Sequence, residues 1–272
     1  MKRYRHYTKE TAILLSCFGS VIEQNMYEDL ARETQERFDG CDVFVSYSSR
    51  MVIKKLAKEG KYYKNLAQTL ADIDALGYKR IVVASVNLFP TDEHELLIKT
   101  VEGFKHFSMA NIRHTKAIIH KTKESSLMLK ALHEAVSEEG WANLYVIHGV
   151  PLLHWEGNHA VTYAESFLKL LSAHNYTCSL EGSFPFYAVG DVLAEQMKEQ
   201  GITRVQIVPM LLVSGNHYRN DMVEIAQTLA QHFETRIAPS LSASERFNLI
   251  ELPDVRAIIF KNIEEEIIKL GC

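Results

Sequence analysis

Two stretches decide the fold: LADIDALGYKRIVVASVNLFPTDEH, residues 70–94, and LAEQMKEQGITRVQIVPMLLVSGNH, residues 193–217. In each, a helical pattern ends at a glycine, an arginine follows, an apolar run typical of a buried strand comes next, and a histidine closes the stretch. The spacing from glycine to histidine is 17 residues in the first stretch and 16 in the second. Matching elements at matching spacing indicate an internal duplication.

The rest of the chain alternates in the same way. Short apolar runs predict buried strands at residues 12–18, 43–47, 81–86, 117–119, 144–147 and 205–212. Longer amphipathic stretches predict helices at residues 23–38, 65–76, 124–137 and 160–173, and the chain is expected to end in a docked helix. Continuous apolar strands separated by helices are typical of α/β folds with parallel sheets that helices cover on both faces.

The duplication predicts two similar α/β lobes, residues 1–139 and 140–272, with a cleft between them. The openings of the two halves, AILLSCFGS and LYVIHGVPL, also correspond when a shift of two residues sets Phe18–Gly19 against His148–Gly149. Open parallel sheets bind ligands beyond the C-terminal ends of their strands. The loops that follow the strands are therefore the candidate site.

Composition excludes several classes of protein. The formal net charge of −4 argues against a nucleic-acid-binding protein, and no apolar run is long enough to span a membrane. The four cysteines have no CxxC spacing and the N-terminus shows no signal peptide, so we expect a cytoplasmic protein with reduced thiols. Neither GxGxxG nor GxxxxGK[ST] occurs, which disfavours a nucleotide or sugar-phosphate enzyme, and no organic cofactor is expected.

Three chemically suitable side chains lie at strand ends of the second lobe. His148 and His217 follow predicted strands, and Glu181 follows the strand-like stretch NYTCSL at 175–180. At the ends of parallel strands they could converge on one site. Two imidazoles and a carboxylate suit Co²⁺, Ni²⁺, Fe²⁺ or Zn²⁺ better than Mg²⁺ or Ca²⁺, and three ligands leave coordination positions open. No short metal-binding motif such as HExxH is present, so this hypothesis depends on the convergence alone.

Three segments carry a resemblance to a known family: LLSCFGS at 14–20, SYSSRMVIKKL at 46–56, and VQIVPMLLVSGNHYRNDM at 205–222. From residue 12 to about residue 222 the chain resembles the anaerobic cobalt chelatases, which are sirohydrochlorin cobaltochelatases of class II. The third segment is the longest and most specific match. The resemblance implies a two-lobed chelatase that inserts Co²⁺ into a tetrapyrrole during anaerobic cobalamin biosynthesis.

The resemblance also assigns roles. It implies that His148, Glu181 and His217 hold the metal, and that His148 and His217 are catalytic, as ligands or as acceptors of a ring proton; which histidine does which stays open. Ile147 replaces the glycine that the family has before the first histidine, and a longer loop follows. His154 or His159 in that loop could replace His148 or help to bind the macrocycle.

Sirohydrochlorin carries carboxylates, so an acidic enzyme must place cations locally. We expect Arg50, Arg219 and His154 to bind the substrate, and the neighbouring lysines of the 46–56 segment to form a solvated helix face. Two aromatic residues, Phe184 and Tyr218, could stack on the ring, although ordinary packing is the better prediction. Glu93 and His94 occupy the first-lobe place of Asn216 and His217, and could face the cleft or cap a helix.

Two alternatives stay open. One is another tetrapyrrole chelatase or a dechelatase that handles iron or nickel, because the ligand types do not separate these metals. The other is a non-catalytic carrier of tetrapyrrole or metal, since two lobes around a cleft also suit a binding protein. The resemblance is compatible with a homo-oligomer, which nothing in the chain demands.

Overall fold

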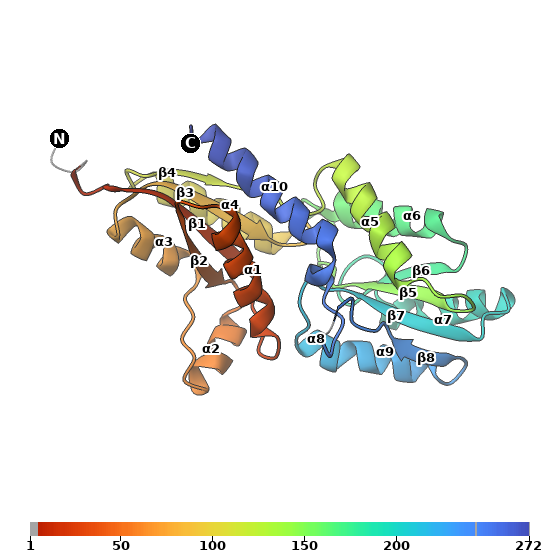
Figure 1. Ribbon diagram of the computed structural model, residues 1–272. Coiled ribbons are helices and arrows are strands. Elements are labelled where there is room, and N and C mark those ends of the chain that lie inside the picture. The colour runs from red at the N-terminus through yellow and green to blue at the C-terminus, as the bar shows by residue number, and fades with distance from the viewer. Residues whose placement is uncertain (1–4, 243, 272) are drawn as a thin grey trace. The chain divides into compact units, whose positions relative to one another are not determined.

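The computed structural model describes residues 5–242 and 244–271, which form two compact units. The first unit contains the chain up to Ile118 and again from Arg256 onward, and the second runs from Ile119 to Val255. Each unit is a four-stranded parallel sheet with helices on both faces (Figure 1). The predicted fold class is therefore confirmed.

The sheet of the first unit has the strand order β2-β1-β3-β4. Its strands are β1 (Lys9–Cys17), β2 (Cys41–Tyr47), β3 (Tyr78–Val86) and β4 (Asn111–His114). One face is covered by α3 (Leu66–Ala75) and α4 (Asp92–Lys105), whose apolar side chains pack against the sheet. Residues 12–15 of the inner strand β1 are fully buried, which explains why this strand reads as an unbroken apolar run.

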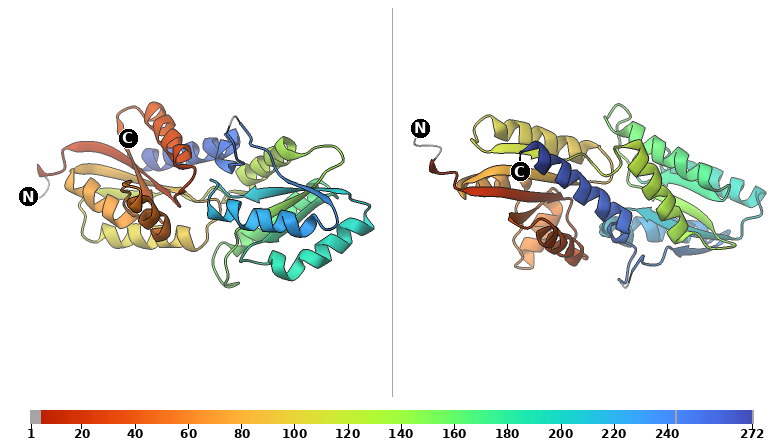
Figure 2. Two further views of the ribbon diagram at one scale, coloured as in Figure 1. Left: turned by 90° about the horizontal axis from the view of Figure 1, so that it is seen from below. Right: turned by 45° about the horizontal axis from the view of Figure 1, so that its top comes forward.

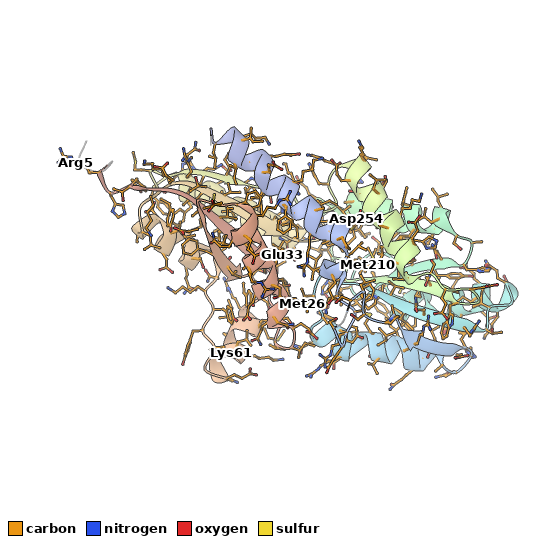
Figure 3. All side chains as sticks on the ribbon, viewed as in Figure 1. Arg5, Met26, Glu33, Lys61, Met210 and Asp254 are labelled. Carbon is orange, nitrogen blue, oxygen red and sulfur yellow. The ribbon has the colours of Figure 1, made fainter. Side chains whose placement is uncertain are left out.

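Three more helices belong to the first unit: α1 (Gln24–Arg37), α2 (Arg50–Lys58) and, for most of its length, the C-terminal α10 (Pro253–Lys269). Figure 2 shows α10 lying along the first sheet. Arg256 pairs with Glu33 of α1 (2.7 Å; Glu33 is labelled in Figure 3), and Arg113 of β4 pairs with Glu266 (2.5 Å). The predicted docked C-terminal helix is confirmed.

The second unit repeats this plan with the strand order β6-β5-β7-β8. Its strands are β5 (Ala142–Ile147), β6 (Asn175–Ser179), β7 (Arg204–Met210) and β8 (Glu234–Ile237). Its helices are α5 (Thr122–Val136), α6 (Asn158–Leu171), α7 (Phe186–Glu199), α8 (Asn216–Arg219) and α9 (Asp221–Leu229), with a short 3₁₀ turn η2 (Leu249–Glu251). One core cluster joins α7 and α9 to the sheet. In both sheets the first strand along the chain takes the second place in the strand order, and the other strands follow in the same arrangement. The identical orders support the duplication inferred from the sequence.

One local prediction needs correction. Residues 117–119 are buried but form no strand; the fourth strand of the first sheet is β4, whose polar sequence NIRH suits a short edge strand. In the second sheet, Pro209 of β7 stays in register with Val146 of β5. The missing N–H of Pro209 is tolerated because β8 pairs with β7 only as far as Ile207.

The division of the chain also differs from the predicted boundary near Gly140. The structure divides the chain after Ile118, so α5 belongs to the second unit, and it returns the chain from Arg256 onward to the first unit. The repeat that is visible in the sequence begins at β5, so it gives no sign that α5, which precedes β5, belongs to the second unit. Among the described residues, no helix is both long and apolar enough to cross a membrane.

Candidate metal centre

His148 comes directly after β5 and is held by the loop that follows β6. The backbone N–H of Leu180 donates to the carbonyl of Ile147 (2.9 Å), and the N–H of Glu181 donates to the carbonyl of His148 (3.0 Å). The pairing of the two strands thus continues past their ends. It fixes the backbone of His148 at the C-terminal edge of the sheet, where parallel sheets bind ligands.

Two glycines let these loops approach each other. Gly149 has a φ of 76°, in the left-handed region, and a methyl group added to it would lie 2.5 Å from the backbone of Gly182. A side chain on Gly149 would be strained in conformation and would also push the loops apart. The glycine after His148 is therefore needed for the position of this histidine.

His217 lies on α8, a one-turn helix after β7. Met210, labelled in Figure 3, is the last residue of that strand. The loop between them is anchored at the fully buried Ser214, whose N–H donates to Asn248 Oδ1 (2.7 Å) and whose hydroxyl donates to the carbonyl of Phe247 (2.6 Å). These buried bonds hold the backbone from which His217 projects.

The structure brings the two predicted histidines together. The Nε2 atoms of His148 and His217 are 3.2 Å apart, with the ring centroids at 4.6 Å and the ring planes nearly perpendicular. The other nitrogen of each ring has its own oxygen partner: His148 Nδ1 lies 3.0 Å from the carbonyl of Gly149, and His217 Nδ1 lies 2.8 Å from Asp221 Oδ2. Both oxygens are acceptors, so each Nδ1 is assigned as the donor.

This assignment has a chemical consequence at the facing nitrogens. A neutral imidazole that donates from Nδ1 carries a lone pair on Nε2, so two such rings place two lone pairs against each other. Lone pairs at this distance repel unless a cation, either a proton or a metal ion, lies between them. The arrangement of His148 and His217 therefore suits a cation held between the two Nε2 atoms.

The spacing also suits a metal. An imidazole–metal bond of about 2.1 Å, as found for zinc, places two ligand nitrogens about 3.0 Å apart at a right angle and about 3.4 Å apart at the tetrahedral angle. The observed Nε2–Nε2 distance of 3.2 Å lies between these values. His148 and His217 need little rearrangement to bind a divalent first-row metal.

The third predicted ligand is placed differently. Glu181 contacts His148 through a backbone hydrogen bond, and the residue is exposed to solvent. Across the described residues, no group of three or more His, Cys, Asp or Glu side chains is close enough to hold a metal. Two of the three predicted ligands are thus assembled, and the role of Glu181 stays a prediction.

Two buried cysteines, Cys17 and Cys178, are poor metal ligands. Neither forms a disulfide within the described part of the chain. Burial raises the pKa of the Cys17 and Cys178 thiols well above the usual range. Both thiols therefore stay protonated at neutral pH, whereas a metal ligand would have to be a thiolate.

The predicted substrate-binding residues lie on the surface. Arg219 is exposed on α8, two residues after His217, and Arg50 is the exposed first residue of α2 in the first unit. Neither guanidinium has an ion-pair or hydrogen-bond partner within the described part of the chain. His154 is also exposed, in the loop before α6, and lies parallel to the ring of Trp155 at 6.3 Å; His159 is exposed at the start of that helix.

The first unit lacks the same histidine pair. Phe18–Gly19 follows β1 where His148–Gly149 follows β5, and Gly19 likewise has a positive φ, of 97°. His94, the counterpart of His217, is 3% exposed, and its Nδ1 lies 2.8 Å from the hydroxyl of Ser85. His94 is therefore a core residue, and the duplicated fold has its facing imidazoles in the second unit.

Sequence reasoning missed the role of Asp221. This residue is the first of α9, and its carboxylate accepts a hydrogen bond from His217 across a spacing of four residues. Carboxylates commonly orient metal-binding histidines in this way. The i,i+4 spacing of His217 and Asp221 was the available signal, because residues so spaced meet on one face of a helical segment.

Comparisons with known proteins identify the family and the fold. The chain matches the model of one family, described as cobalt chelatase (CbiK), over residues 11–267. A protein of Salmonella typhimurium described as sirohydrochlorin cobaltochelatase is 23% identical over 219 residues, which cover 78% of this chain and 79% of that protein.

Two solved structures share the fold. SirB from Bacillus subtilis with Fe³⁺ has a TM-score of 0.66 at 18% identity, covering 94% of this chain and 95% of that one. The sirohydrochlorin chelatase SirB from Bacillus subtilis subspecies spizizenii, in complex with cobalt, has a TM-score of 0.64 at 17% identity, covering 94% of each chain. At these identities the two structures establish similarity of fold.

Proposed function

Because this chain belongs to the cobalt chelatase family, we propose that it inserts Co²⁺ into a sirohydrochlorin-like tetrapyrrole, with the metal held by His148, His217 and Glu181 before transfer. The facing Nε2 atoms of the two histidines, 3.2 Å apart with both Nδ1 atoms bonded elsewhere, carry this proposal. They form a ligand pair at the edge of the sheet where the family's chemistry is expected.

The choice of cobalt and of sirohydrochlorin comes from the comparisons. The family description names cobalt, and the Salmonella relative is described as a sirohydrochlorin cobaltochelatase. One SirB structure holds cobalt and another holds Fe³⁺. Imidazole and carboxylate ligands bind several first-row metals, so this donor set suits Co²⁺ without excluding iron or nickel.

The two histidines can take part in the proton balance of the reaction. Inserting one M²⁺ into a free-base tetrapyrrole forms bonds from the metal to the ring nitrogens and releases two protons from two ring N–H groups. When the metal leaves His148 and His217, the two Nε2 atoms regain their lone pairs and can share one of these protons, while the other passes to solvent. The bonds from Nδ1 to Gly149 and Asp221 keep both rings oriented during the exchange.

Glu181 would complete the set of ligands. Its backbone bond to His148 keeps this loop beside the metal-binding histidine, and its exposed side chain is free to turn toward the metal. A carboxylate would lower the net charge of the complex. Three protein ligands would leave at least one coordination position open for a ring nitrogen.

Cations for the carboxylates of the substrate are available at Arg219 and Arg50, both exposed and without an ion pair in the described structure. An arginine binds a carboxylate with two parallel hydrogen bonds, which fixes the direction of the substrate's acidic side chain. Arg219 is the stronger candidate because it shares the short helix α8 with His217. His154, in the loop that follows His148, is proposed as a further contact.

An anaerobic absorbance assay of Co²⁺ insertion into sirohydrochlorin tests this proposal. We expect His148→Ala and His217→Ala each to lower the turnover rate by at least about 100-fold, because each removes a ligand and a proton acceptor. His174→Ala, a change at an exposed histidine of the same unit, is the matched control and should leave the rate unchanged. Native rates in both site variants would refute the proposed metal ligands, and no insertion by the native protein would refute the proposed function.

A further inference from the structure

The backbone at Phe184 is unusual. Among the described residues, Phe184 is the only non-glycine residue with a positive φ, at 56°. The left-handed conformation is unfavourable for a residue with a Cβ, and glycine adopts it freely. A phenylalanine at this position therefore lowers the stability of the fold, and such strain is often found at functional sites.

Packing of the phenyl ring does not offset that strain. Phe184 is 58% exposed, whereas Tyr218, the other aromatic residue flanking the ligands, packs against the core cluster of the second unit. The prediction of ordinary packing thus holds for Tyr218 and is wrong for Phe184. A large apolar side chain that is both strained and exposed is unfavourable twice in the free protein.

The conformation is imposed by a tight loop built on Ser179. The backbone N–H of this fully buried serine donates to the carbonyl of Phe184 (3.1 Å), and its hydroxyl donates to the carbonyl of Ser183 (2.8 Å) and accepts from the N–H of Gly182 (3.0 Å). Pro185, next in the chain, precedes the first residue of α7. The ring of Phe184 is therefore presented from a well-defined backbone.

The same loop is bonded to the metal centre. Glu181, three residues before Phe184, donates its N–H to the carbonyl of His148, and Gly182 contacts Gly149 closely. The adjoining His148 loop also exposes apolar side chains, Leu153 most of all at 76%. Apolar groups are thus displayed on the two loops that surround the ligand pair.

We infer that Phe184 is a specificity-determining residue whose ring contacts the flat face of the tetrapyrrole. This inference rests on the proposed function and adds a substrate contact to it. A tetrapyrrole has the broad apolar π surface that would cover an exposed phenyl ring, and aromatic rings favour offset or edge contacts with such a surface. Its carboxylates then remain for the arginines.

Phe184→Gly tests the inference because it removes the strain and the ring together. The variant should be at least as stable to urea as the native protein. The dissociation constant for metal-free uroporphyrin, a four-ring polycarboxylate used as the probe, should rise roughly tenfold. The affinity for Co²⁺ alone should stay within about twofold, and Phe184→Tyr, which keeps a ring, should bind the probe like the native protein.

Leu170→Ala, at an exposed leucine on α6, is the matched control and should change neither affinity. Native uroporphyrin affinity in Phe184→Gly would overturn the inference, and so would an equal loss of Co²⁺ affinity, which would indicate damage to the metal loop. If Phe184→Gly binds the probe normally while His217→Ala abolishes turnover, the inference fails and the proposed function stands. If the native protein gives no insertion of Co²⁺, the proposed function itself fails, whatever the affinity of Phe184→Gly for the probe.

Discussion

Glu165 on α6 provides the sharpest prediction about stability. This residue is 3% exposed, and its Oε1 has no hydrogen-bond partner among the residues that the structure describes. Burial raises the pKa of its carboxyl from 4.5 to about 7, against the opposing charge of Lys169. A raised pKa means that the folded state favours the protonated acid. The penalty for the charged form is absent below about pH 4.5, grows as the pH rises, and is complete above about pH 7.

Glu165→Gln removes the charge and keeps the shape. The difference between 4.5 and about 7 corresponds to roughly 3 kcal/mol, at about 1.4 kcal/mol per pH unit. The variant should therefore be more stable than the native protein by up to about 3 kcal/mol at pH 8, and nearly equal to it at pH 4. The gain should develop between those two values of pH.

Urea unfolding followed by circular dichroism, from pH 4 to pH 8.5, measures this difference. Glu199→Gln, at an exposed glutamate on α7, is the matched control, and its effect should be small at every pH. A free-energy difference between Glu165→Gln and the native protein that does not change with pH would refute the reasoning, because only a perturbed titration makes the difference depend on pH.

Three further predictions concern the site. Gly149→Ala should lower the free energy of unfolding, measured by urea titration, by more than about 2 kcal/mol, because it combines a positive φ with a methyl group 2.5 Å from backbone. Gly60→Ala, at a similar φ with open space around it, should cost only about 1 kcal/mol in the same titration. Asp221→Asn should weaken Co²⁺ binding about 10- to 100-fold by calorimetry, and Asp191→Asn on α7 should not; equal affinities would exclude an orienting role for the carboxylate. Arg219→Ala should raise KM for sirohydrochlorin several-fold with little change in kcat, and the effect should shrink at high salt; a KM independent of Arg219 would remove it from the substrate site.

Much of the fold was predictable because the inner strands are buried on both faces. The runs in β1, β3 and β5 are apolar without interruption over residues 12–15, 81–84 and 144–147, and only Gln206 interrupts the run in β7. A glycine also stands between helix and strand at corresponding places in the two repeats. The edge strands gave weaker signals. β4 and β8 have four residues each and carry charged side chains, so their apolar content is too low to distinguish them from loops.

The candidate site was predictable in part. The positions of His148 and His217 after strands, together with the family resemblance, were enough to pair them. The orientation of each imidazole ring was not predictable, because it depends on the backbone after Ile147 and on the turn that brings Asp221 to His217. The left-handed conformation of Phe184 also has no local signal, since it is imposed by hydrogen bonds to Ser179.

Crystals soaked in Co²⁺ under anaerobic conditions test the central claim most directly, through the anomalous signal at the cobalt edge. The account predicts one strong peak between His148 and His217, about 2.1 Å from each Nε2, with Glu181 turned toward it. A cobalt peak elsewhere, with the two imidazoles unchanged and still facing each other, would contradict the claim that these histidines are the metal ligands.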